Sequence, residues 1–87
     1  MYVILVYDIG VERVNHVRIF LKKYLNWVQN SAFEGELTDA EFMKIKDELD
    51  EITDPAYDCV MIYKVRDKKF IDSELIGTAK AEIGQIV

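Results

Sequence analysis

The sequence predicts an α+β sandwich in which two helices cover one antiparallel sheet of four to five strands. Two observations carry this prediction: apolar residues recur partly in strand-like runs and partly at helical spacing, and turn residues separate these stretches. A chain of 87 residues has material for one hydrophobic core, so residues 1–87 are predicted to form a single domain. Because so short a domain buries only a modest share of its surface, we also expect it to pair with another chain.

The first half of the chain predicts a strand, a helix and a second strand. Tyr2 to Tyr7 is an unbroken apolar run ended by Asp8 and Gly10, which is typical of a central strand covered on both faces. Trp27 to Phe33 alternates as one further strand. Between them a helix is predicted over Val11 to Leu25, and its apolar positions at helical spacing are Val14, Val17, Leu21, Tyr24 and Leu25.

A second helix is predicted by the capping box Thr38-Asp39-Ala40-Glu41, in which Thr38 is the N-cap and Glu41 the third helical residue. The helix must end before Asp54-Pro55, because proline disfavours a helical residue ahead of it. The apolar positions of this helix are Phe42, Ile45, Leu49 and Ile52.

Three further segments complete the predicted sheet. Asp58 to Val65 and Phe70 to Ile76 are predicted to form a hairpin of two strands, with the charged stretch Lys64 to Lys69 as its turn. Ala81 to Val87 is too short to fold alone, but its apolar residues can add to an existing sheet edge. Because Cys59 begins an apolar run, we expect it to be a small buried thiol.

The net charge of −5 is unevenly distributed along the chain. Glu34 to Asp58 holds ten acids and two bases, a charge of −8, whereas the other residues carry nine bases and six acids, a charge of +3. Eight of the eleven bases lie in Arg13 to Lys23 and Lys64 to Lys69. A nucleic-acid partner would therefore contact one of these two stretches, since phosphate binding rests on Lys and Arg.

Several classes of function are excluded because their residues are missing. One histidine, His16, and one cysteine cannot supply the four ligands of a structural zinc site, and no spacing suggests a catalytic partner for His16. No glycine-rich loop of the Rossmann or P-loop kind occurs. The opening apolar run is too short to span a bilayer and lacks the features of a leader peptide, so a soluble, cytoplasmic protein without a membrane partner is expected.

Asp8 is the main candidate for chemistry, because it directly follows the central strand and precedes a helix. One interpretation is structural: its carboxylate accepts hydrogen bonds from the following loop or helix start. The other interpretation is a metal site. Mg²⁺ tolerates one or two carboxylates with waters, so two Asp8 side chains from a two-fold dimer would hold one ion and activate a water against a phosphodiester.

The basic residues leave two interpretations open. Arg13 lies in the first turn of a predicted helix, where the partial positive charge favours acids, so something other than helix stability is expected to hold it there. Arg13 and Arg18 would either contact phosphate or serve solubility. Lys64, Arg66 and Lys68 alternate, which predicts that they lie on one side of an extended segment, as a phosphate contact or as a solvated turn.

Three segments occur together in this chain: a strand that ends Tyr7-Asp8-Ile9, a helix with Arg13, Arg18 and Leu21-Lys22-Lys23, and the run Trp27-Val28-Gln29-Asn30-Ser31-Ala32-Phe33-Glu34-Gly35-Glu36-Leu37. Their combination, over nearly the whole chain, resembles the small CRISPR-associated endoribonuclease family of the spacer-adaptation module. Two positions depart from that family's pattern: His16 stands where relatives often have Lys or Arg, and Ala32 where Val is common.

The resemblance implies a ferredoxin-like fold, which has two strands between its helices where the residues themselves indicate one long segment from Trp27 to Leu37. A break near Asn30-Ser31 would divide that segment into two strands. It implies a homodimer, in which Ala81 to Val87 is a strand exchanged with the partner. Asp8 is then the catalytic, metal-associated acid, with Mg²⁺ or another divalent cation as cofactor. The family's support or nucleic-acid-binding residues correspond to Tyr7, Arg13, Arg18 and Phe33.

The function implied by the resemblance is to scaffold DNA with the CRISPR integrase during spacer acquisition, together with metal-dependent endonuclease cleavage of double-stranded DNA or of RNA, including single-stranded RNA. Two other classes stay open. A dimeric toxin-type ribonuclease of similar fold would act on cellular RNA. A non-enzymatic regulatory module would bind a small ligand or a protein and would lack salt-sensitive binding to duplex DNA.

Overall fold

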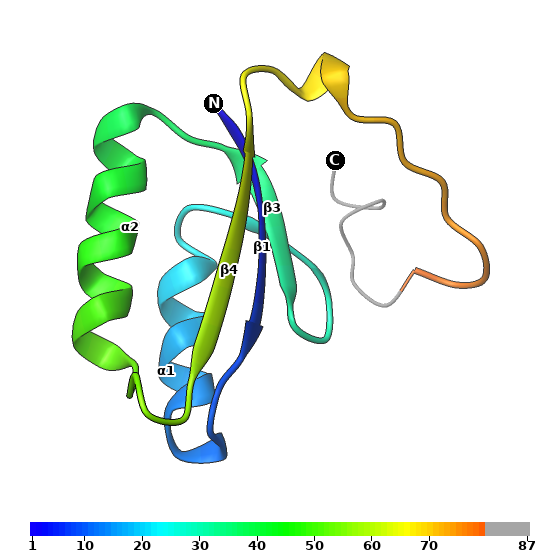
Figure 1. The fold of residues 1–87 in the computed structure, drawn as a ribbon. Coiled ribbons are helices and arrows are strands. Elements are labelled where there is room, and N and C mark those ends of the chain that lie inside the picture. Colours follow the sequence, from blue (N-terminus) through cyan, green and yellow to red (C-terminus); the bar gives the residue numbers. More distant parts are fainter. Residues whose placement is uncertain (80–87) are drawn as a thin grey trace.

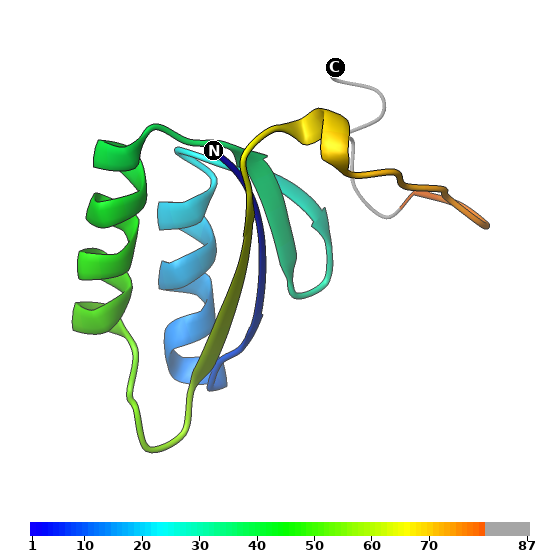
Figure 2. The same cartoon turned by 45° about the horizontal axis from the view of Figure 1, so that its top comes forward.

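The computed structural model describes residues 1–79, which form one sheet with two helices on one of its faces (Figures 1 and 2). The strand order is β2-β3-β1-β4, and every neighbouring pair is antiparallel. This arrangement is ferredoxin-like and confirms the predicted fold class. In chain order the elements are β1 (Tyr2–Asp8), α1 (Val11–Leu21), β2 (Asn26–Gln29), β3 (Ala32–Glu36), α2 (Asp39–Ile52), β4 (Cys59–Val65) and the 3₁₀ helix η1 (Lys68–Phe70).

The core lies between the inner face of the sheet and the two helices. Alternate residues of β1 point inward, and Val3, Leu5 and Tyr7 are all buried. Phe33 of β3 is fully buried beside them, and burial of such a side chain stabilises the fold by about 1.5–3 kcal/mol. The helices complete this cluster with Val17 and Leu21 from α1 and Phe42, Ile45 and Leu49 from α2.

The opposite face of the sheet, called the outer face below, is only partly covered by residues 1–79. Val6 of β1 pairs with Met61 of β4, and their side chains are 36% and 50% exposed. This corrects the prediction that the central strand is covered on both faces. Cys59, the first residue of the edge strand β4, is likewise exposed rather than buried, because it lies on this same face.

The second helix follows its prediction closely. The Oγ1 atom of Thr38 accepts a hydrogen bond from the N–H of Glu41 at 3.1 Å, and the N–H of Thr38 donates to Oε1 of Glu41 at 2.9 Å. The predicted capping box is therefore confirmed, and it satisfies two of the backbone donors near the start of α2. The helix ends at Ile52, before Asp54-Pro55, as predicted.

The first helix ends at Leu21, four residues earlier than the prediction of Val11 to Leu25. The N–H groups of Lys23 and Tyr24 donate to carbonyls three residues back, at 3.1 and 3.0 Å, so the helix tightens into a turn. Leu25 stays buried because the turn keeps it against the core, and its N–H still donates to the carbonyl of Leu21 at 2.8 Å.

The predicted single strand over Trp27 to Phe33 is wrong. Two antiparallel strands, β2 and β3, are joined by the two-residue turn Asn30-Ser31. Asn30 has a φ of 29°, in the left-handed region that Asn tolerates better than most residues. The Nε1–H of Trp27 donates to the carbonyl of Asn30 at 3.2 Å and helps to close the turn. The two strands between the helices agree with the resemblance.

The predicted strand over Phe70 to Ile76, and with it the predicted hairpin, is also wrong. The side chain of Asp67 accepts a hydrogen bond from the N–H of Lys69 at 3.0 Å and begins η1, which turns the chain away from β4. Lys68 thus lies in a helical turn and does not continue an extended alternation with the bases before it. The predicted strand Ala81 to Val87 lies outside the described residues.

Candidate functional site

Asp8 is the last residue of β1, and its side chain belongs to the outer face at one end of the sheet. Its backbone pairs with Cys59, and the alternation that buries Tyr7 directs Asp8 away from the helices. The residue is exposed, and no hydrogen bond or ion pair of its carboxylate occurs within residues 1–79. The N-terminus of α1 has no side-chain cap, so Asp8 does not serve as one.

A second carboxylate, that of Asp58, lies just before β4 and has a different environment. Its side chain is only 1% exposed. The Nε and Nη2 groups of Arg13 donate to it at 2.6 and 2.9 Å, and the backbone N–H groups of Gly10 and Asp54 each donate to it at 2.8 Å. These contacts, those of Arg13 foremost, hold the pKa of Asp58 well below its usual range.

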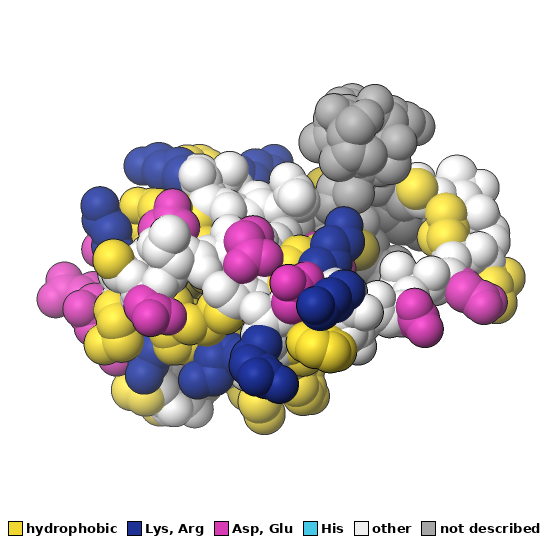
Figure 3. All heavy atoms as spheres, turned by 90° about the horizontal axis from the view of Figure 1, so that it is seen from above, with side chains coloured by type: hydrophobic (Ala, Val, Ile, Leu, Met, Phe, Trp, Pro, Cys, Tyr) yellow, Lys and Arg dark blue, Asp and Glu magenta, His cyan; other side chains and the backbone are white. Residues whose placement is uncertain are grey.

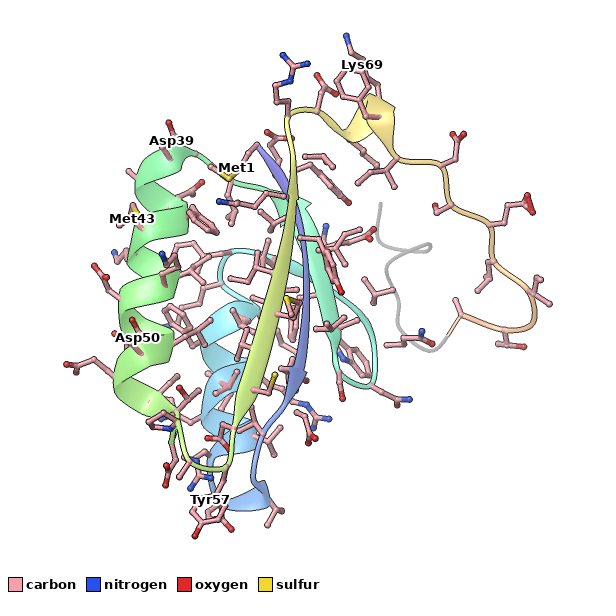
Figure 4. The ribbon with its side chains drawn as sticks, in the orientation of Figure 1. Met1, Asp39, Met43, Asp50, Tyr57 and Lys69 are labelled. Carbon is pink, nitrogen blue, oxygen red and sulfur yellow. The ribbon has the colours of Figure 1, made fainter. Side chains whose placement is uncertain are left out.

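This arrangement joins three segments at the end of the sheet where Asp8 lies. Asp58 connects the loop between β1 and α1, the first turn of α1, and the loop between α2 and β4. Tyr57, in the loop between α2 and β4, marks this end of the molecule in Figure 4. Arg13, a predicted nucleic-acid or support residue, is 26% exposed here, and it also contacts Glu12 at 3.2 Å. Contact of Arg13 with phosphate stays a prediction.

Tyr7 connects the same end of β1 to the turn between β2 and β3. Its hydroxyl donates to the carbonyl of Asn30 at 3.0 Å and accepts from Nε of Arg18 at 3.2 Å. Its ring lies 6.1 Å from the ring of Phe33, centroid to centroid. Tyr7 and Phe33 are both buried, whereas Arg18 keeps part of its surface in solvent. The support or nucleic-acid-binding role of these three residues stays a prediction.

The second basic stretch lies at the other end of the sheet. β4 begins beside Asp8 and ends beside Tyr2, so the bases after β4 are about 20 Å from Asp8 along the strand. The ammonium groups of Lys64 and Lys68 lie over different rings, Phe42 at 4.9 Å and Tyr2 at 5.8 Å. Figure 3, seen from this end, shows Lys and Arg side chains scattered among acidic ones.

Tyr2 lies at this far end and has a pKa shifted from its usual value. Burial and the neighbouring carboxylate of Glu34 raise the pKa of Tyr2 to about 12. The N-terminal amine lies nearby and forms an ion pair with Glu36 at 3.0 Å. The far end thus carries a neutral tyrosine and one ion pair of the N-terminal amine, whereas the carboxylate of Asp8 at the other end of β1 has no ion pair within residues 1–79.

Comparison with known proteins identifies the relatives of this chain. The family model of CRISPR associated protein Cas2 matches residues 1–72. A protein from Methanosarcina acetivorans is 55% identical over 87 residues, and one from Pyrococcus furiosus is 52% identical over 87 residues; each alignment covers 100% of both chains. The chain belongs to the Cas2 family. Both of these relatives are named CRISPR-associated endoribonuclease Cas2.

Solved structures of Cas2 proteins have the same fold. One Cas2 crystal structure superposes with a TM-score of 0.85 at 46% identity, covering 93% of this chain and 91% of that one. Cas2 of Streptococcus pyogenes superposes with a TM-score of 0.72 at 32% identity, covering 85% of this chain and 99% of that one. Neither helix within residues 1–79 has the length and apolar character that crossing a membrane requires.

The metal predicted for Asp8 requires ligands, and one chain offers few of them near this residue. No group of three or more His, Cys, Asp or Glu side chains gathers within residues 1–79. At the end of β1, Asp8 supplies a hard, exposed carboxylate, and Cys59, which pairs with it across the strands, supplies a soft thiol that Mg²⁺ disfavours. A donor set that fits Mg²⁺ would therefore need the Asp8 of a second chain, with waters completing the coordination.

Asp58 is the site residue that sequence reasoning missed. Its partner Arg13 is 45 positions away, and no local pattern joins the two. A signal was nevertheless present, because an arginine in the first turn of a helix is unfavourable unless an acid lies beside it. Asp58, which follows Asp54-Pro55 and directly precedes a strand, was the acid placed to provide that partner.

Proposed function

We propose that this Cas2-family chain works in the cytoplasm as a homodimer of CRISPR spacer acquisition. In that role it scaffolds double-stranded DNA with the CRISPR integrase, and it cleaves phosphodiester bonds of RNA or DNA in a reaction that depends on Mg²⁺. The observation that supports this proposal best is the exposed carboxylate of Asp8, which has no partner within residues 1–79 and lies at the end of an apolar sheet face.

The outer face supports a dimer because its apolar residues are neighbours in space. Val6 pairs with Met61, and Tyr63 follows two positions along the same face of β4. Their side chains are 36%, 50% and 58% exposed. A contiguous apolar surface of this kind is stabilised when a second copy covers it, and a two-fold axis lets the same face serve both chains.

Contact between two outer faces would also create a binding site for a metal ion. If the two-fold axis runs near the carboxyl end of β1, the Asp8 side chains of the two chains come together, and their like charges repel unless a cation lies between them. When bound, Mg²⁺ would supply positive charge against the phosphate and lower the pKa of a coordinated water. The chain's own part is to hold two hard oxygen ligands and to present the substrate to them.

Substrate binding would rest on the bases that this geometry leaves in solvent. Arg18 keeps part of its surface exposed near the Asp8 end, and Lys22 and Lys23 follow in the turn after α1. Phosphate contacts by such side chains give affinity that falls as salt is raised. The relatives' name, endoribonuclease, supports RNA as a substrate, and the family's place in CRISPR systems supports the integrase and DNA as partners.

The decisive variant is Asp8→Asn, which removes the negative charge and keeps the size of the side chain. We expect it to abolish Mg²⁺-dependent cleavage of both RNA and double-stranded DNA while it remains a dimer in sedimentation. Asp47→Asn, an equal change of charge on the exposed side of α2, is the matched control and should cleave like the unmodified protein. Undiminished cleavage by highly purified Asp8→Asn protein would contradict the nuclease, whereas integrase-dependent insertion of DNA would test the scaffold separately.

A further inference from the structure

The end of the sheet near Asp8 contains an ion pair, between the buried carboxylate of Asp58 and the partly exposed Arg13, that the proposed chemistry does not use. Asp58 accepts hydrogen bonds from Arg13, Gly10 and Asp54, and its side chain is almost fully buried. We propose that Asp58 and Arg13 are positioning residues, which hold the loop between β1 and α1 so that the carboxylate of Asp8 keeps its direction. This inference rests on the proposed function, because it assigns a task in relation to Asp8.

The connection from Asp58 to Asp8 is short along the chain. Asp8 is held on one side by the ladder to Cys59, and Gly10, two residues later, donates its N–H to Oδ1 of Asp58 at 2.8 Å. Only Ile9 lies between these two points. Since Asp58 itself directly precedes Cys59, both restraints come from the start of β4. The backbone that carries Asp8 is therefore held between two fixed points.

The start of α1 depends on the same carboxylate. The N-cap residue of α1 is Gly10, which has no side chain to cap the helix. Asp58 brings a negative charge to this helix N-terminus from a distant segment, and negative charge is favoured there. Arg13 reaches back from the first turn with a two-pronged contact, Nε to Oδ2 and Nη2 to Oδ1. Such a fork fixes direction as well as distance.

Gly10 is part of the same arrangement because of a close approach. A Cβ atom at this position would lie 2.6 Å from Nη2 of Arg13 and 2.5 Å from Oε1 of Glu12. The backbone of Gly10, with φ −56° and ψ 145°, is open to alanine, so the obstacles are the ends of the Arg13 and Glu12 side chains and not the conformation. An alanine here pushes the guanidinium of Arg13 and the carboxylate of Glu12 aside, and so moves the fork on Asp58 without removing a charged group.

Three variants test the proposal: Asp58→Asn, Arg13→Lys and Gly10→Ala, each measured well below its melting temperature. The first keeps an acceptor but not the charge, the second keeps the charge but not the fork, and the third moves the fork. The matched control is Leu37→Ala, a buried change directly after β3, at the other end of the sheet, that lowers stability without touching this loop.

The first readout is the broadening by Mn²⁺ of the Asp8 and Ile9 amide resonances in the dimer. We expect all three variants to raise the half-saturating Mn²⁺ concentration about 10-fold, as loss of a supporting contact around a ligand typically does, and the control to leave it unchanged. Equal half-saturation in the unmodified protein and the three variants would overturn the proposal. So would a shift in Leu37→Ala as large as theirs.

The second readout separates this inference from the proposed function. If Mn²⁺ broadens nothing near Asp8 even in the unmodified protein, the metal role fails, and the positioning role is judged by amide order parameters at Ile9 and Gly10 instead. Lower order parameters in all three variants, with unchanged values in Leu37→Ala, support it. Unchanged order parameters overturn it. A loss of DNA affinity in Arg13→Lys with normal order parameters would assign Arg13 to phosphate and not to Asp58.

Discussion

Tyr7→Phe removes one hydroxyl from the interior and tests how the Asp8 end of β1 is tied to the turn between β2 and β3. That hydroxyl donates to the carbonyl of Asn30 at 3.0 Å and accepts from Arg18 at 3.2 Å. Neither partner is left fully unsatisfied, because Trp27 still donates to the Asn30 carbonyl and Arg18 keeps part of its surface in water. The expected loss is therefore about 1 kcal/mol of unfolding free energy, the net value of an ordinary hydrogen bond.

For a domain of this size that loss corresponds to a fall in melting temperature of about 4–8 °C. The assay is thermal and urea unfolding at one fixed chain concentration, since the stability of a dimer depends on concentration. Tyr24→Phe is the matched control, because the Tyr24 hydroxyl makes no hydrogen bond within residues 1–79 and should change stability little. If both variants lost the same stability, or Tyr7→Phe lost none, the account of this network would be refuted.

Three further predictions follow from other parts of the structure. Thr38→Ala should lose about 1 kcal/mol of stability in urea unfolding, because α2 loses its capping box, whereas Ser73→Ala, outside any helix or strand, should lose almost none. The pKa of Asp58 is depressed in the folded chain, first of all by the hydrogen bonds of Arg13, so on acidification the unfolded chain binds a proton before the folded chain does. This contribution to the unfolding free energy is therefore complete at neutral pH and is lost progressively as the pH is lowered below about 4. An acid titration of unfolding should show a shallower loss of stability in Asp58→Asn. Cys59, exposed on the outer face, should react with a maleimide readily at low chain concentration and more slowly as the dimer forms, and a rate independent of concentration would count against a dimer through this face.

Local signals account for the parts of the fold that sequence reasoning predicted. The unbroken apolar run of β1 and the capping box at Thr38 each depend on residues a few positions apart in the sequence. The strand and the helix start that they predict are both present. The break at Asn30-Ser31 followed only from the resemblance, and no residue pattern showed it, because the turn contains no glycine. Asn30 takes the left-handed conformation itself, and a tyrosine far away in the sequence helps to hold its carbonyl.

A local turn, the orientation of an edge strand and one contact between distant residues account for what the sequence could not show. Asp67 begins a helical turn through one hydrogen bond to the N–H of Lys69, which no alternation of charges indicates. Cys59 was expected to be buried from its apolar neighbours, but burial in an edge strand depends on which face each residue takes. Asp8 was predicted as a site residue because it ends a strand. Asp58 was not predicted, because its structural role depends on contact with Arg13, 45 residues earlier.

The central claim is that two chains share one metal through Asp8, and the stoichiometry of binding tests it most directly. We expect titration with Mn²⁺, followed by the paramagnetic resonance of the free ion, to give one tightly bound ion for every two chains. The same titration of Asp8→Asn should give none, with Asp47→Asn unchanged. One ion per chain, or a bound ion that survives in Asp8→Asn, would contradict the account.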